Sequence, residues 1–238
     1  MNTMQNILKS VLCLSLIIFT MSSCSKDDDK NDVVVTEADA ADVTASALEL
    51  NSSGLALELK EITLYIENGI QTLTCAVSHD TIVTKTTTGV TTGTATLNLT
   101  YLLNCDSIGD PISLKITGTT SGNYNGPRTE GTHTGSRDLL FAPNSNDELL
   151  VNGTFIRTGS FTSKVRTLNS YTATVTVTAT NLLITGIDGI IKGGTATVNA
   201  KTSVTGGNDF EFNGTVVFNS AGVATLTING TQYTIALY

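Results

Sequence analysis

Few side chains in this sequence of 238 residues are suited to acid–base chemistry. The sequence contains two histidines, and one of them, His133, stands three positions after Glu130 and close to Arg128 and Arg137. A carboxylate and an imidazole could form a general acid–base pair, as in a hydrolase, if their side chains met in the fold. The competing interpretation is a solvated polar loop.

The stretch from Ser121 to Asp147 is rich in glycine and has the weakest strand pattern in the sequence. We expect a long surface loop here, and long loops often carry binding residues. The candidate binding residues, for a partner protein or a glycan, are Tyr124, Arg128, Glu130, His133 and Arg137.

Motifs for cofactor chemistry do not occur in the sequence. It has no zinc-ligand spacing, nucleotide-binding loop, nucleophile elbow or EF-hand pattern. The formal net charge of −8 also lacks the basic surplus typical of nucleic-acid binding. We therefore expect no cofactor, no metal site, no nucleic-acid partner and no enzymatic activity.

Residues 1–23 have the features of a signal peptide. Lys9 is their only charged residue, and the apolar run from Val11 to Phe19 is too short to span a bilayer comfortably. The sequence Met-Ser-Ser then precedes Cys24. This boundary resembles a bacterial lipobox, and the resemblance implies cleavage before Cys24 and acylation of its thiol and amine. Several acyl chains on one residue would give a stable membrane anchor.

The residues after Cys24 are strongly acidic. Lys26 is followed by Asp27, Asp28 and Asp29, which is similar to the export signal of Bacteroidota surface lipoproteins. The resemblance covers the first 32 residues and implies a lipoprotein of the outer membrane that faces the cell exterior. Residues 25–50 hold eight acidic and two basic side chains. We therefore expect a flexible acidic tether over residues 24–60.

Two cysteines remain beyond this N-terminal segment. Cys75 and Cys105 would lie in an envelope or extracellular compartment, where disulfides persist. We expect a disulfide between them, with two buried free thiols as the alternative.

Alternating apolar and polar residues dominate the rest of the sequence, together with 42 threonines. Threonine is typical of strands with one solvated face. In residues 172–180, threonines alternate with Ala173, Val175, Val177 and Ala179. We expect this apolar row to be buried and the threonines to be exposed.

Turn signals divide this region into short strands. Asn68-Gly69 predicts a two-residue hairpin turn after a strand that begins at Glu61. Further strands are expected over residues 70–77, 81–88, 94–103, 112–119, 149–158, 170–180, 195–205, 209–218, 222–229 and 231–237. Residues 61–238 should thus form a single antiparallel β-sandwich or open β-barrel of about ten strands. Only residues 33–60 could form a short helix, with Thr36 as its N-cap and Asp39 at position N3.

These features favour a lipid-anchored, non-enzymatic binding or structural module at the outer-membrane surface. The alternative hypothesis is a carrier of a lipid or small apolar ligand inside an open barrel, held against Leu97, Leu99, Val175 and Val177. A carrier requires an apolar cavity, whereas a binding module requires an exposed patch.

Overall fold

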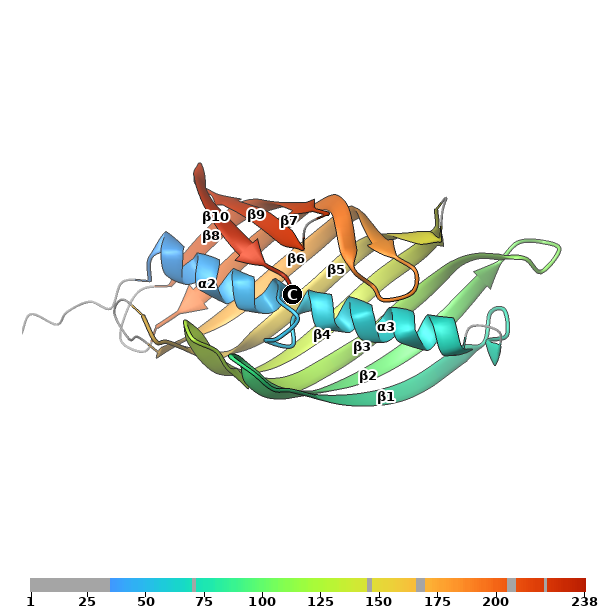
Figure 1. Cartoon of the computed structure of the whole chain (residues 1–238), viewed down its shortest axis with the longest axis horizontal. Helices are drawn as coiled ribbons and strands as arrows, with labels where there is room; N and C mark the ends of the chain where they lie inside the picture. Colours follow the sequence, from blue (N-terminus) through green and yellow to red (C-terminus); the bar gives the residue numbers. More distant parts are fainter. Residues whose placement is uncertain (1–34, 70–71, 145–146, 166–169, 205–208, 221) are drawn as a thin grey trace, which may run out of the picture. The chain divides into compact units, whose positions relative to one another are not determined.

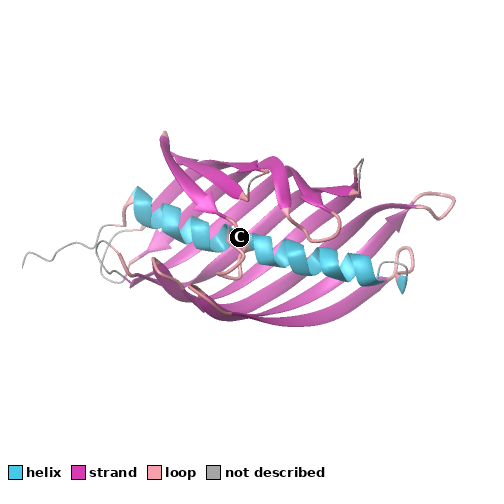
Figure 2. Ribbon diagram, viewed as in Figure 1, coloured by secondary structure: helices cyan, strands magenta, loops and turns pink. Residues whose placement is uncertain are grey.

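One antiparallel sheet with two α-helices against one of its faces makes up the fold (Figure 1, Figure 2). The computed structural model describes residues 35–69, 72–144, 147–165, 170–204, 209–220 and 222–238. The signal segment, Cys24 and residues 25–34 lie outside these ranges. The described part of the chain is all-β, as expected.

The sheet has ten strands, and each strand pairs with its neighbours in sequence order. They are β1 (Ser78–Thr87), β2 (Thr92–Cys105), β3 (Pro111–Asn125), β4 (Thr129–Pro143), β5 (Glu148–Ser163), β6 (Ser170–Thr185), β7 (Ile191–Ser203), β8 (Phe210–Asn219), β9 (Val223–Ile228) and β10 (Thr231–Ala236). β1 and β10 are the two edges, so the sheet is open. The sequence predicted an antiparallel sandwich or open barrel of about ten strands, and in the described part of the chain the ten antiparallel strands form one open sheet.

The alternation expected for residues 172–180 is confirmed. Val175 and Val177 of β6 are 0% exposed, whereas Thr172 and Thr178 are exposed. We call the side of the sheet that carries the buried row the helix face, and the opposite side the outer face. Because side chains alternate along each strand, every strand contributes to both faces.

The hairpin predicted around Asn68-Gly69 is wrong. Helix α3 occupies Leu55–Gly69, and residues 72–77 form turns that lead into β1. The buried apolar residues of α3 recur at intervals of three and four, at Leu55, Leu59, Ile62 and Ile66. The β-branched and aromatic residues of Ile-Thr-Leu-Tyr-Ile favour strands only weakly, and packing of this helical stripe against the sheet overrides that preference.

The tether predicted over residues 24–60 is wrong from residue 35 onward. Helix α2 spans Glu37–Leu48, and its residues Val43 and Leu48 are completely buried. The capping box predicted for it is confirmed, because the Asp39 amide donates to Thr36 Oγ1 (3.2 Å) and the Thr36 amide donates to Asp39 Oδ2 (3.0 Å). Neither α2 nor α3, the helices of the described residues, is long and apolar enough to cross a membrane.

The linker between α2 and α3 contacts both edges of the sheet. The amide of Leu50 donates to the carbonyl of Leu237, directly after β10 (2.8 Å), and Thr87 Oγ1, at the end of β1, donates to the carbonyl of Asn51 (3.1 Å). Because one short linker reaches both edges, the sheet must curve around the helices. The helix face is therefore the concave face.

Cys75 and Cys105 form the expected disulfide, with their Cα atoms 5.8 Å apart. Cys75 lies in the turns before β1, and Cys105 ends β2. The amide of Ala76 donates to the carbonyl of Leu103 (2.9 Å), which holds this turn beside the end of β2. The bond thus attaches the connection after α3 to the sheet.

Loss of this disulfide should lower stability substantially. Its sequence separation is 30 residues, and a bond that closes such a loop stabilises a protein by about 3.5 kcal/mol through the unfolded state. For a domain of this size, that corresponds to a fall of about 10 °C in melting temperature. We expect Cys75→Ser/Cys105→Ser to show this fall in a thermal melt. Wild-type protein under reducing conditions should match the variant, and a variant that melts with the oxidised wild type would contradict the prediction.

Candidate functional site

The five candidate binding residues lie in regular strands and a tight turn. The loop predicted from Ser121 to Asp147 is wrong, because β3 continues to Asn125 and β4 begins at Thr129. Among the described residues of this stretch, irregular backbone is found in the turn that contains Arg128 and after Pro143. Of the glycines that suggested a loop, Gly126 lies in this turn, and Gly122, Gly131 and Gly135 belong to the strands.

These glycines make room for large side chains on the helix face. Gly122 and Gly159 lie on either side of His133 across the strand pairs, Gly118 lies opposite Arg137, and Gly135 lies opposite Arg157. A Cβ atom at Gly122 would lie 3.1 Å from His133 Cε1 and 2.5 Å from the Thr94 carbonyl oxygen. Packing of the large side chains on the helix face therefore requires glycine at these positions of β3, β4 and β5.

The five residues do not form one cluster. Tyr124, His133 and Arg137 are buried on the helix face. Glu130 belongs to the outer face and pairs with Lys164 (3.0 Å), while Arg128 pairs with Asp42 of α2 (2.8 Å). The acid–base pair considered for Glu130 and His133 is therefore wrong, because strand alternation places the two side chains on opposite faces of β4.

A buried ion pair joins α3 to the sheet. Arg137 Nε lies 3.1 Å from Glu58 Oε2, and both side chains are almost completely buried. Thr120 Oγ1 donates to Glu58 Oε1 (2.6 Å) and accepts from Arg137 Nη2. Burial raises the pKa of the Glu58 carboxyl above its ordinary value, and the Arg137 guanidinium offsets part of that rise.

A second buried arginine joins α2 to the sheet. Arg157 Nη1 donates to the Ser46 carbonyl of α2 (2.5 Å), and Nη2 lies 2.9 Å from Nδ1 of His133. The guanidinium carbon lies 5.0 Å from the centre of the Tyr124 ring, within the range of a cation–π contact. Burial lowers the pKa of Arg157 to about 10, so the side chain remains charged at neutral pH.

His133 is neutral in this setting. Burial, and secondarily the charge of Arg157, lower its pKa to about 3. Because the arginine can only donate, Nδ1 must be the accepting nitrogen, and the neutral ring then carries its proton on Nε2. Arg157 and Glu58 were missed in the sequence, although Gly135, opposite Arg157, marks a space for a large inward side chain.

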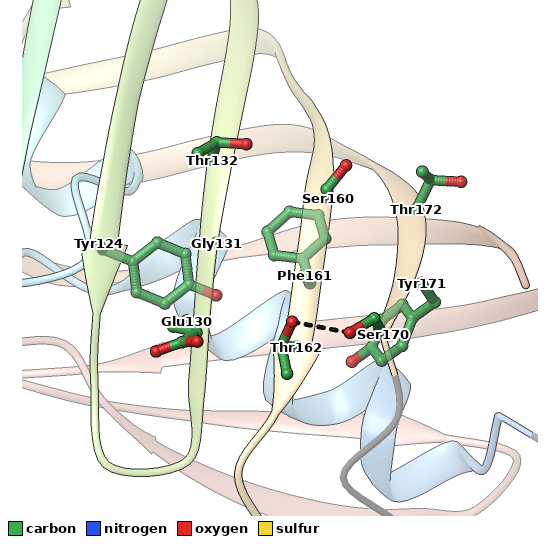
Figure 3. A pocket seen from close by; sticks show the side chains of 10 residues that line it. All are labelled: Tyr124, Glu130, Gly131, Thr132, Ser160, Phe161, Thr162, Ser170, Tyr171 and Thr172. Carbon is green, nitrogen blue, oxygen red and sulfur yellow. Dashed lines mark hydrogen bonds between the residues drawn. The ribbon is translucent and has the colours of Figure 1, made fainter.

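The outer face carries a hollow of about 500 Å³ at the ends of β4, β5 and β6 (Figure 3). Its lining side chains from the outer face are one carboxylate and five hydroxyls, from Glu130, Thr132, Ser160, Thr162, Ser170 and Thr172. Thr162 Oγ1 and Ser170 Oγ are 2.9 Å apart and share a hydrogen bond. Tyr124, Phe161 and Tyr171 complete the lining from the buried row.

The chemistry of this hollow is hydrogen bonding. Hydroxyl groups both donate and accept, which suits a ligand that carries many hydroxyls of its own. No group of three or more His, Cys, Asp or Glu side chains in the described part of the chain is placed to hold a metal ion.

The helix face is filled rather than hollow. Leu97, Leu99, Val175 and Val177, the residues expected to hold an apolar ligand, are at most 2% exposed. An apolar pocket of about 50 Å³ lies between the C-terminal end of α3 and the ends of β2 to β5. It is too small for a lipid, so a carrier would have to displace a helix.

The buried imidazole should make stability depend on pH. His133 has a pKa of about 3 in the folded protein against an ordinary value of 6.5, so the unfolded chain takes up a proton first as the pH falls. The free energy of unfolding is therefore highest above pH 6.5. Below that pH, protonation of His133 in the unfolded chain lowers it, by about 2 kcal/mol between pH 7 and pH 5. We expect His133→Gln, which keeps an acceptor for Arg157, to lack this loss in urea unfolding at the two pH values. An equal loss in both proteins would show that other groups cause it.

Comparisons with known proteins add no family to this description. No protein-family model, no curated protein and no solved structure matches the chain. A functional proposal therefore rests on the sequence signals and on the geometry described above.

Proposed function

We propose that the protein is a lipid-anchored, non-enzymatic module of the cell envelope that binds a neutral glycan on the outer face of its sheet. The anchor is Cys24, and the export signal after it directs the domain to the exterior of the outer membrane. The hollow at the ends of β4 to β6 is the binding site. The observation that carries the proposal is the lining of this hollow by five hydroxyl groups.

The chemistry of the hollow favours a neutral polyhydroxylated ligand. The Thr and Ser hydroxyls can form paired hydrogen bonds with sugar hydroxyls, and Glu130 can accept from them. The carboxylate of Glu130 would repel an acidic sugar. Its partner Lys164 offsets part of that charge from 3.0 Å away.

The arrangement of the ionisable groups favours binding over catalysis. Glu130 is the one acid or base among the residues that line the hollow, and acid–base hydrolysis of a glycosidic bond requires two such groups. His133 belongs to the opposite face, where its Nδ1 accepts from Arg157. The hollow therefore supports recognition of a glycan and not its cleavage.

Removal of hydroxyls from the hollow should weaken glycan binding. Ser160→Ala/Thr172→Val deletes two hydroxyls and keeps the shape of the strands. A net contribution of about 0.5–1.5 kcal/mol for each of the two hydrogen bonds predicts a loss of about 5- to 150-fold in affinity. The measurement is titration calorimetry with maltohexaose, cellohexaose and mannohexaose, and with oligogalacturonate as the acidic comparison.

The matched control is Thr178→Val/Thr197→Val. These threonines face each other across β6 and β7 on the same outer face and do not line the hollow. The control should bind as the wild type does. Absence of binding to every neutral oligosaccharide, or an equal loss in both double variants, would refute the hollow as the site.

The anchor can be tested separately. Cys24→Ser removes the acylated thiol, and we expect the protein to move from the membrane fraction to the soluble fraction of the envelope, because an acyl anchor contributes about 0.8 kcal/mol for each buried CH₂ group. Asp27→Ala/Asp28→Ala/Asp29→Ala should keep the anchor but lose exposure to protease added to intact cells. Membrane association of Cys24→Ser that equals wild type would contradict the assignment.

A further inference from the structure

The buried polar cluster on the helix face has more positive than negative charge. Arg137 and Arg157 are both at most 4% exposed, and Glu58 is the one carboxylate that pairs with either of them among the described residues. Arg157 has no carboxylate of the described part within 4.0 Å. A buried charge without an opposite partner costs several kcal/mol. Glu58 and Glu49 act on Arg157 from beyond that distance, so the cluster lacks an anion in direct contact with this guanidinium.

The cluster also has more donors than acceptors. Arg157 Nε, Arg137 Nη1 and His133 Nε2 are buried and have no hydrogen-bond partner among the described residues. Arginine nitrogens can only donate, and His133 carries its proton on Nε2 because Nδ1 lies against Arg157. These three atoms are therefore donors. Arg137 Nε and Glu58 Oε2 also lack a hydrogen-bond partner among the described residues, but they face each other in the ion pair at 3.1 Å. A group with several acceptor oxygens and a negative charge would satisfy the three donors.

Helix α2 covers Arg157 with apolar side chains that are on average smaller than those of α3. It buries Ala40, Ala41 and Ala47 together with Val43 and Leu48, whereas α3 buries mainly leucines and isoleucines. Since apolar burial contributes about 25 cal/mol per Å², alanines hold α2 less firmly than leucines hold α3. Displacement of α2 would remove the Ser46 carbonyl from Arg157.

Polar contacts join α2 to the sheet along the length of the helix. Near the N-terminus, Asn229 Nδ2 donates to Glu37 Oε1 (2.6 Å) and Tyr171 donates its hydroxyl to the Asp39 carbonyl (3.5 Å). In the middle of the helix, Arg128 pairs with Asp42. Ser53, with a φ of 61°, lies in the linker to α3. Displacement of α2 would break these contacts, of which the pair of Asp42 with the largely exposed Arg128 contributes little, while Glu58 of α3 would stay on Arg137.

We infer that the helix face binds the oxyanion head group of an amphiphile, a carboxylate or a phosphate, at Arg157 and His133 when α2 is displaced. The apolar tail takes the place of α2 against Val175 and Val198, which belong to the strands that α2 contacts. The Ser46 carbonyl occupies the guanidinium of Arg157 while α2 is in place. This site lies on the face of the sheet opposite to the glycan hollow, and Tyr124 is the residue that contacts both, since it lines the hollow and its ring lies against Arg157.

The test uses the full chain with Cys24→Ser, so that no acyl group of its own competes. Decanoate, decanol and inorganic phosphate are titrated into this protein and into the same chain with Arg157→Met. Lys115→Met, which removes an exposed cation paired with Asp138, is the matched control. Binding is followed by calorimetry and by the shift in melting temperature.

We expect decanoate to bind saturably, about tenfold more tightly than decanol, and to lose this advantage in Arg157→Met but not in Lys115→Met. Phosphate could instead raise the melting temperature as much as decanoate does, and lose this effect in Arg157→Met. That result would also support the oxyanion site and would identify a free anion as its ligand. The inference is overturned if no oxyanion binds, or if Arg157→Met binds decanoate as well as the parent does.

A second measurement does not depend on the stability of a variant. Hydrogen exchange of the α2 amides in the parent chain should become faster when decanoate binds, because the tail replaces the helix. The amides of α3 should keep their protection. Unchanged exchange in α2 at saturating decanoate would overturn the displacement of the helix.

Discussion

The packing of two helices against the concave face of one sheet is the interaction on which the rest of the structure depends. A sheet of ten strands with two unpaired edges has no second sheet to cover its apolar side. The linker between α2 and α3 bonds to both ends of this sheet, through Leu50 and Leu237 and through Asn51 and Thr87. The edges are also protected individually. β10 has only six residues, and β1 carries the inward cation Lys85, held by Glu61 of α3 at 3.0 Å.

Curvature around the helices explains the glycines of the central strands. Arg137, Arg157 and His133 each lie beside a glycine of a neighbouring strand. A Cβ atom on the neighbouring strand would take up space that these large side chains occupy. In that space, Arg137 pairs with Glu58 of α3, and Arg157 donates to the Ser46 carbonyl of α2. The polar cluster thus links α2 and α3 to the same three strands, and the glycines are as much a part of it as the charged residues.

Much of the sheet could be predicted from the sequence, because alternation with a period of two is a local signal. Val175 and Val177 are buried where this period places them. The helix over residues 55–69 could not be predicted in the same way, since its stripe is defined by contact with a sheet that is assembled from later residues. The candidate site could be predicted only in part, for a related reason. The spacing of Glu130 and His133 in the sequence suggests that they are neighbours, but only their assignment to strand β4 shows that they lie on opposite faces of the sheet.

The alternation that separates these two residues also separates two possible functions of one sheet. Thr132 and Ser160 line the outer hollow, while His133 and Gly159, their neighbours in sequence, pair with each other on the helix face. A ligand on the outer face needs no movement of the fold, because its partners already lie at the surface. A ligand on the helix face must compete with α2, which follows directly on the segment that would be tethered to the membrane. The two faces still share Tyr124, which lines the outer hollow and whose ring centre lies 5.0 Å from the guanidinium carbon of Arg157, so a ligand that moves this ring on one face also changes the surroundings of Arg157 on the other.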